Sequence, residues 1–241
     1  TIPRGDGAEG PIPPYRALAA TLRAALYQQE RPESVVAVLQ RVQEAARKVR
    51  DRLSLDSWRA INHLEGFADS PSADPLDRLE DTLFTLSAFS GLAMESMTRG
   101  LGWRFMDMGR RLERAINLTH RIRTVLPGIC DGSPSALEAL LEVADSIMTY
   151  RARYRAVFQL APVLDLLLAD ESNPKSLAFQ CSQLAEHVDQ LPRQSNRRFT
   201  TNEERLALEM LTSVRLIDLT NLDCGNNIDT SGSLPTFLES I

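Results

Sequence analysis

Charged side chains are densest in the segment from Trp103 to Arg121, and their types suit the binding of an anion. Arginine guanidinium groups hold carboxylates and phosphates through two parallel hydrogen bonds. A carboxylate among several arginines would act as a general base or as their structural counter-ion. The residues that could do this chemistry are Trp103, Asp107, Arg110, Arg111, Glu113 and Arg114. We predict that they form either a buried polar network or a ligand site.

A single helix must carry these residues, because an apolar stripe with helical spacing runs through the same segment. The stripe consists of Leu101, Phe105, Met108, Leu112, Ile116, Thr119, Ile122 and Leu126. Spacings that alternate between three and four residues are typical of a bundle helix. We therefore expect this stripe to form a seam toward the core, with the charged residues beside it.

Arg151 occupies a position where the next helical pattern calls for an apolar residue. The face that it shares in a helix expected over 134–157 consists of Leu137, Leu140, Leu141, Ala144, Ile147, Met148 and Tyr154. Because an unpaired buried guanidinium is costly, we expect Arg151 to meet a carboxylate from another helix, either Glu113, Asp107 or Glu95. The alternative is that its stem is covered while its charged head reaches solvent. Arg215 presents the same choice.

Helix start signals and the lack of strand patterns indicate the fold class. The signals are Asp74-Pro75, Ser133-Pro134, Asn173-Pro174 and the capping-box pair Thr201 and Glu204. No segment alternates in polarity as a strand does, and the connections are short. We predict an all-α protein, an antiparallel helical bundle of about six to eight helices over residues 15–223. Residues 1–14 read as a linker, and 224–241 as a loop and the start of a truncated helix.

Composition argues against several classes of partner. The chain has 27 basic and 32 acidic residues, a net charge of -5, and no clustered basic face, so we expect no nucleic acid partner. Its three cysteines show no metal-binding or disulfide spacing, which fits a reducing compartment and a cytoplasmic location. No apolar run approaches the roughly 20 residues that a membrane span needs, and no signal-peptide pattern opens the chain. We expect no membrane partner.

Known catalytic and metal-binding motifs are missing from the sequence. There is no GxxxxGK[ST], GxGxxG or GxSxG run, which argues against a phosphate loop or a nucleophile elbow. A di-metal carboxylate bundle needs Glu-x-x-His pairs, and none of the three histidines has a glutamate three residues before it. We therefore expect no metal and no cofactor, and we assign no catalytic residue.

The run GWRFMDMGRRLERA at 102–115 resembles the Glu-Arg signature of the bacterial alpha-E domain family, an all-helical family of poorly defined function. Segments 49–62 and 160–180 are similar to further segments of that family, in the same order. The signature falls on Trp103, Arg104, Gly109, Arg110, Arg111, Glu113 and Arg114. The family's opening helix, with another Glu-Arg element, has no counterpart here. The resemblance therefore implies an incomplete charged centre if that helix contributes to it.

The resemblance also implies a partner. Similar proteins are often fused to, or encoded beside, circularly permuted ATP-grasp proteins and transglutaminase-like peptidases. We therefore expect a non-catalytic helical module that works with an ATP-grasp-type peptide or amide ligase, by docking it or presenting its substrate. One alternative is an enzyme or binding protein whose Arg110, Arg111, Arg114 and Arg151 clamp an anionic amino acid or peptide. The other alternative is a purely structural bundle.

Overall fold

Helices make up most of the residues that the structure describes. The computed structural model describes residues 15–69, 74–130, 133–154, 157–192, 200–217 and 219, and these residues contain no strand. The predicted all-α class is therefore confirmed. The chain divides into two compact units, Thr1–Arg99 (unit 1) and Gly100–Ile241 (unit 2), where the sequence suggested one bundle over 15–223. The expected linker at 1–14 and the expected loop and helix start at 224–241 lie outside the described residues.

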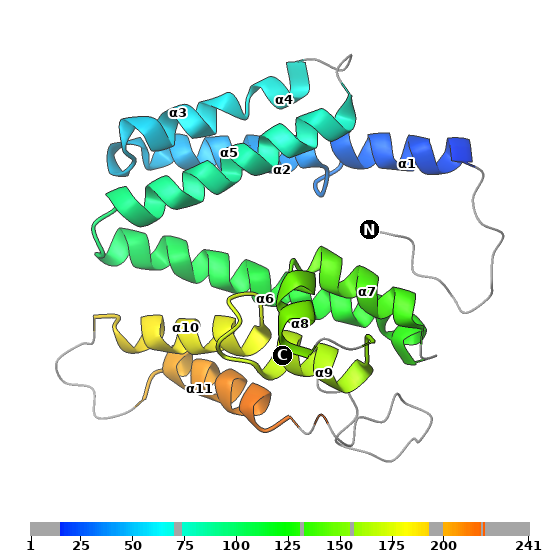
Figure 1. The fold of residues 1–241 in the computed structure, drawn as a ribbon. Coiled ribbons are helices and arrows are strands. Elements are labelled where there is room, and N and C mark those ends of the chain that lie inside the picture. Colours follow the sequence, from blue (N-terminus) through cyan, green and yellow to red (C-terminus); the bar gives the residue numbers. More distant parts are fainter. Residues whose placement is uncertain are drawn as a thin grey trace. The chain divides into compact units, whose positions relative to one another are not determined.

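Unit 1 is built from helices, some of which begin at a side chain that caps the first turn (Figure 1). They are α1 (Tyr15–Tyr27), α2 (Val35–Lys48), a 3-10 turn (Arg50–Arg52), α3 (Leu55–His63), α4 (Gly66–Asp69) and α5 (Pro75–Ser96). The Ser54 hydroxyl accepts a hydrogen bond from the Ser57 amide at 3.1 Å, and Asp74 caps α5 through the Leu76 amide at 3.0 Å. The start at Asp74 was expected from the sequence, and Ser54 caps α3 by the same side-chain chemistry.

The core of unit 1 is small. Its buried members are Val36, Leu39, Leu64 and Phe67. The Tyr27 ring stacks on Phe67 with centroids 5.5 Å apart. On α5 the inward face carries Thr82 and Thr85, and the Thr82 hydroxyl donates to the Arg78 carbonyl, which allows a threonine to be buried.

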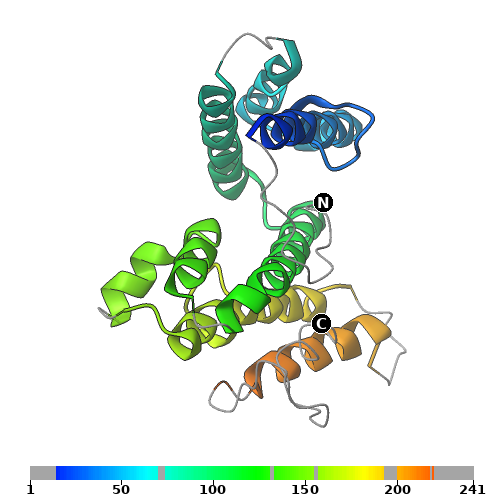
Figure 2. The same ribbon diagram turned by 90° about the vertical axis from the view of Figure 1, so that its right-hand side faces the viewer.

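Unit 2 is built around α6 (Leu101–Cys130). It continues with α7 (Pro134–Val143), α8 (Ile147–Tyr154), α9 (Leu160–Leu164), a π-helical turn η2 (Asp165–Ala169), α10 (Leu177–Asp189) and α11 (Asn202–Arg215). Helix α10 packs against α6 and against α11, as both ribbon views show (Figures 1 and 2). The predicted capping box of Thr201 and Glu204 begins α11.

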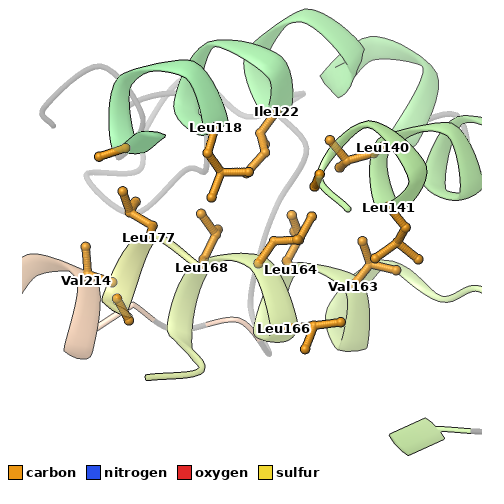
Figure 3. Close-up of a cluster of buried hydrophobic side chains, with 14 of the residues drawn as sticks. Leu118, Ile122, Leu140, Leu141, Val163, Leu164, Leu166, Leu168, Leu177 and Val214 are labelled. Atoms are coloured by element: carbon orange, nitrogen blue, oxygen red, sulfur yellow. The ribbon is translucent and has the colours of Figure 1, made fainter. Parts of the chain in front are cut away.

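Aliphatic side chains fill the core of unit 2 (Figure 3). The labelled members are Leu118, Ile122, Leu140, Leu141, Val163, Leu164, Leu166, Leu168, Leu177 and Val214. The run 163–168 supplies Val163 and four leucines with no exposed surface. Burying each leucine contributes roughly 1.5–3 kcal/mol, so this short segment anchors α9 and η2 beneath α6 and α10.

The helix expected over 134–157 is interrupted, which is a correction. Asp145 adopts a left-handed φ of 51°. The Ser146 amide donates to the Leu141 carbonyl and the Asp145 amide to the Glu142 carbonyl, both at 2.9 Å. This is the Schellman pattern that ends a helix, with aspartate where glycine is more usual. Because of such breaks, the described residues contain more helical segments than the predicted six to eight.

Asn173-Pro174 does not begin a helix as expected. Helix α10 begins at Leu177, and the Ser176 hydroxyl caps it by accepting from the Phe179 amide at 3.0 Å. The Asn173 amide instead donates to the Leu166 carbonyl in η2 at 2.9 Å. A π-helical turn departs from the ordinary hydrogen-bond ladder, and Asn173 satisfies one of its carbonyls.

Candidate functional site

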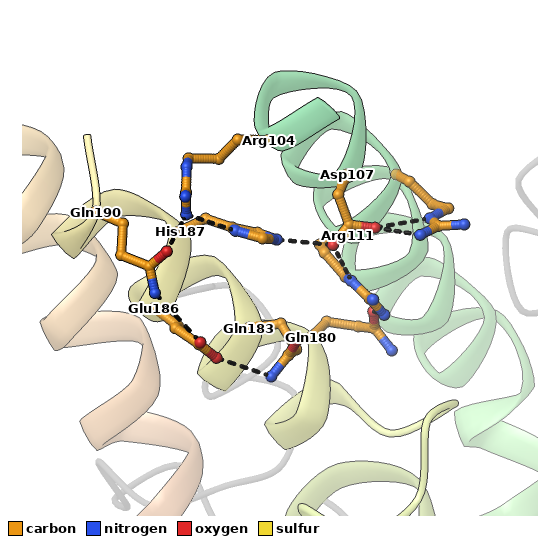
Figure 4. Close-up of polar contacts among 9 residues, drawn as sticks. Arg104, Asp107, Arg111, Gln180, Gln183, Glu186, His187 and Gln190 are labelled. Carbon is orange, nitrogen blue, oxygen red and sulfur yellow. Dashed lines mark hydrogen bonds and ion pairs between the residues drawn. The ribbon is translucent and has the colours of Figure 1, made fainter. Parts of the chain in front are cut away.

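A buried polar cluster joins α6 to α10 and is centred on Asp107, whose side chain is 1% exposed (Figure 4). From α6, Arg110 Nε donates to Asp107 Oδ1 at 3.0 Å, and Arg111 Nε donates to Oδ2 at 3.1 Å. From α10, His187 Nε2 lies 2.7 Å from Oδ2. Arg110 Nη2 also donates to Oδ1. The carboxylate thus has four donors, which equals its capacity.

A second ring of contacts holds the cluster in place. Arg111 Nη1 donates to Gln180 Oε1 at 3.3 Å, and its guanidinium lies 5.2 Å from the Phe179 ring centroid. Gln180 Nε2 donates to the Pro174 carbonyl at 2.7 Å. Arg104 donates to Gln190 Oε1. Both polar ends of Gln180 are therefore used inside the protein.

His187 lies between a hydrogen-bond donor and an acceptor, which fixes its tautomer. Arg104 Nη1 is 3.4 Å from His187 Nδ1, and a guanidinium can only donate. The ionised Asp107 carboxylate on the other side can only accept. The arrangement therefore places the proton of His187 on Nε2. The Trp103 ring lies edge-on to the imidazole, with centroids 5.3 Å apart and planes at 76°.

The surroundings of Asp107 keep it ionised. Burial raises its pKa, but hydrogen bonds from His187 and Arg110 and the positive charges of Arg111 and Arg110 outweigh that effect, so the pKa is lowered to about 2. The pKa of the neighbouring Arg114 guanidinium lies below its ordinary value because of partial burial and repulsion from Arg110 and Arg111. An ionised carboxylate whose acceptor positions are all occupied is suited to holding helices together, not to accepting a substrate proton.

The structure brings together Trp103, Asp107, Arg110 and Arg111, and it leaves out the other predicted members. Glu113 is exposed and accepts from Asn117 Nδ2 at 3.2 Å. Much of Arg114 is exposed as well, although its guanidinium is partly covered and close enough for the charges of Asp107, Arg110 and Arg111 to act on it. The predicted network therefore exists, but its acid is Asp107, and the Glu113–Arg114 pair lies outside it.

Of the two alternatives for Arg151, the structure shows the second, in which the charged head reaches the surface. Its side chain is 56% exposed and pairs with Glu138 of α7 at 3.1 Å, not with Asp107, Glu113 or Glu95. The reason is the helix end at Asp145, which starts α8 in a new register. Arg215 also reaches the surface, where it binds both oxygens of Glu171 at 2.6 and 2.9 Å.

Sequence reasoning missed the half of the cluster that α10 supplies. His187 and Gln180 are buried on the face of α10 that carries Leu177, Cys181, Leu184 and Val188. Their spacing of seven residues places both on one face of a helix. Polar residues on an apolar stripe are the signal that drew attention to Arg151, and the same signal could have found these two.

The predicted apolar seam of α6 is only half correct. Thr119 and Ile122 are buried, but before them the seam is exposed except for Met108, which is half-buried. Five exposed residues follow one another at alternating spacings of three and four, and we call them the outer face of α6: Gly102, Phe105, Gly109, Leu112 and Ile116. Phe105 is 58% and Ile116 62% exposed, and a Cβ added at either glycine would meet nothing within 4 Å. The side chain of Leu126 lies outside the described residues.

The described residues provide neither a metal site nor a membrane-spanning helix. Within the ranges that the structure describes, no three His, Cys, Asp or Glu side chains are grouped so that they could hold a metal ion. None of the helices in those same ranges has both the length and the apolar character required to cross a membrane.

The fold and the cluster define a class of protein. It is an all-helical protein in which one long helix, α6, carries a run of arginine and acidic residues. The chain belongs to the Alpha-E family, described as a predicted alpha-helical domain with a conserved ER motif. The match covers residues 7–241. The resemblance found in the sequence is thereby confirmed.

The chain is similar to three curated proteins, each of which is named an uncharacterized protein. They include an uncharacterized protein of Mycobacterium bovis and two of Mycobacterium tuberculosis, each 32% identical over 81% of this chain. The matched region is 23% of each relative, so the chain spans about a quarter of their length. No solved structure matches the chain.

Proposed function

We propose that this chain is a non-catalytic helical module that acts with an ATP-grasp-type peptide or amide ligase, fused to it or encoded nearby. The observation that supports the proposal best is the division of α6 into two sides. One side is buried and saturated by partners within unit 2, and the other is an exposed apolar face. The module would dock the ligase or present its substrate, and ATP chemistry would belong to the ligase.

The buried side of α6 favours a structural role for the charged cluster. All four acceptor positions of Asp107 are used by Arg110, Arg111 and His187. A general base must be able to accept a proton from a substrate, and Asp107 has no position left for one. The arginine-clamp alternative is also weakened, because Arg151 pairs with Glu138 on the surface.

The outer face of α6 favours docking of a helix. Phe105, Leu112 and Ile116 are exposed on one stripe, and contiguous exposed apolar surface marks interaction sites. Gly102 and Gly109 alternate with them and leave room for a close approach of backbones. A stripe with spacings of three and four is the pattern by which one helix packs on another. Glu113, at the edge of this face, would add a charged contact.

The size of the relatives is compatible with a fused partner. More than three quarters of each relative lies outside the region that matches this chain, since the matched region is 23% of its length. A ligase region in that remainder would place the module and the enzyme in one polypeptide. The relatives' activities are not established, so this step is part of the proposal.

Binding of the neighbouring ligase region to this chain tests the proposal. Leu112→Ser with Ile116→Ser should weaken the association at least tenfold, because it removes apolar surface from the contact. Glu113→Ala with Arg114→Ala should weaken it less, because exposed charges contribute little. The matched control is Leu76→Ser with Leu83→Ser on α5, two leucines of similar exposure, which should leave the affinity unchanged. Equal affinity in all variants, or no association, would reject the proposal.

A further inference from the structure

Unit 1 contains a cavity of about 510 Å³ beside α2, which no part of the proposed docking role uses. Its volume lies within the range of roughly 300–1,000 Å³ that small-molecule sites occupy. The floor is formed by the four buried side chains of the unit 1 core, Val36, Leu39, Leu64 and Phe67. An aliphatic group would therefore find an apolar surface at the bottom of this cavity.

The wall of the cavity is rich in side-chain amides, contributed by Gln29, Gln40 and Gln43. Gln43 is only 7% exposed, and no hydrogen bond joins its amide to another residue that the structure describes. The amide of Gln43 is not among the side-chain groups that are both buried and unbonded, so its polar atoms reach the open cavity, where they can bond to water or to a ligand. A side-chain amide both donates and accepts, and a peptide group does the same.

The charged residues at the rim are unequal in number. Arg47 and Glu65 pair with each other at 2.8 Å, which leaves Glu44 as the remaining charge of the lining. Within the described part of the chain no ion pair involves Glu44. The lining therefore has one uncompensated negative charge, which favours a ligand with a positive group.

We propose that this cavity binds the amino-terminal end of a peptide that begins with an aliphatic residue. The terminal ammonium pairs with Glu44, the first peptide group bonds to Gln40 and Gln43, and the aliphatic side chain rests on the Leu39 and Leu64 floor. A site made of amides and apolar groups alone would suit a neutral ligand, and the carboxylate is what selects the ammonium. This inference concerns unit 1 and does not depend on docking at α6.

Titration of the full chain with L-leucinamide tests the proposal, because this probe contains the ammonium, the amide and the side chain. Chemical shifts of the Gln43 amide and the Leu64 methyl groups should saturate. Three related compounds each change one of these groups. N-acetyl-leucinamide lacks the ammonium, glycinamide lacks the side chain, and free leucine has a carboxylate that Glu44 would repel. Each should bind at least tenfold more weakly than leucinamide. Nα-acetyl-lysinamide has its ammonium on the side chain and not at the chain terminus, and it should also bind more weakly than leucinamide.

Two variants locate the contacts. Glu44→Gln should weaken leucinamide binding about tenfold, as expected for a hydrogen bond to a charged group, and should not change the binding of N-acetyl-leucinamide. Glu80→Gln on α5 makes the same charge change away from the cavity lining and should have no effect. Gln43→Leu should abolish the saturable shifts while the protein remains folded. Equal binding of leucinamide and N-acetyl-leucinamide, an equal loss in Glu80→Gln, or no saturable binding would overturn the proposal.

Discussion

The Asp107 carboxylate exchanges its water for four protein donors, and its removal would leave those donors without a partner. Arg111 and His187 are buried, and Arg110 is largely covered. Two guanidinium charges and a ring N–H in such a position are costly when the carboxylate that they share is lost. The loss of stability on replacing Asp107 therefore includes the cost of leaving these buried donors without their acceptor.

Asp107→Asn should lower the free energy of unfolding of unit 2 by about 3 kcal/mol, because the amide cannot neutralise Arg110 and Arg111. Urea unfolding followed by Trp103 fluorescence measures this, in a Trp58→Phe background that removes the other tryptophan. Glu142→Gln, an exposed acid on α7, should change the value by less than about 0.5 kcal/mol. A change that small in Asp107→Asn would show that the cluster contributes little.

The low pKa of Asp107 predicts a specific acid sensitivity. Its pKa is 3.8 ordinarily and about 2 in the folded protein, so the unfolded chain takes up the proton first as the pH falls. The stabilisation is fully present above about pH 4 and is lost between about pH 4 and pH 2; it amounts to roughly 2 kcal/mol. The difference in unfolding free energy between the parent and Asp107→Asn should shrink by this amount across that window. A constant difference from pH 5 to pH 2 would contradict the assignment.

Helix ends illustrate what the sequence could predict and what it could not. The starts at Ser54, Asp74 and Thr201 were predictable because a cap and its amide partner lie within three residues of each other. The end of α7 was not, because an aspartate takes the left-handed conformation in which glycine is the usual signal. The break also sets the register of α8, so the pairing of Arg151 with Glu138 could not be read from the pattern.

Substitutions at Asp145 test this account of the helix end. Asp145→Gly should be more stable than Asp145→Ala by about 1 kcal/mol, because alanine is strained at a φ of 51°. Asp145→Asn should lie close to the glycine variant. Lys175→Ala removes the ion pair with Asp145, found at 2.6 Å, and so measures that contribution separately. Thermal melting of the four variants gives the order, and equal stability of the glycine and alanine variants would be inconsistent with backbone strain.

The orientation of α6 depends on a partner that is far away in sequence. Its apolar and charged stripes were both visible, but nothing local states which one faces the core. That choice is made by His187 and Gln180, about 70–80 positions further along the chain, which complement Asp107 and Arg111. All four predicted residues that lie together, at positions 103, 107, 110 and 111, come from one local run, whereas their partners on α10 required knowledge of the fold.

The two units differ in how much apolar surface they bury. Unit 2 has a continuous core that includes the five fully buried aliphatic residues of the run 163–168, whereas the core cluster of unit 1 has four buried residues beside a cavity. The local cost of opening rises with buried apolar contact. We therefore expect unit 1 to open more readily than unit 2.

Amide hydrogen exchange measures this difference directly. Amides of Leu166–Leu168 and Leu177–Leu184 should exchange more slowly than those of Val36–Leu39, by at least tenfold, because their opening disrupts the larger core. Leucinamide at saturating concentration should slow exchange in α2 and leave α10 unchanged. Faster exchange in α10 than in α2 would be contrary to the buried surfaces described above.

The four-donor arrangement around Asp107 also has an evolutionary consequence. A lineage that replaced the carboxylate alone would carry stranded guanidinium and imidazole groups, so single steps are disfavoured while a joint exchange for aliphatic residues is physically acceptable. Positions 107, 111 and 187 should therefore covary across descendants of a common ancestor, either all polar or all apolar.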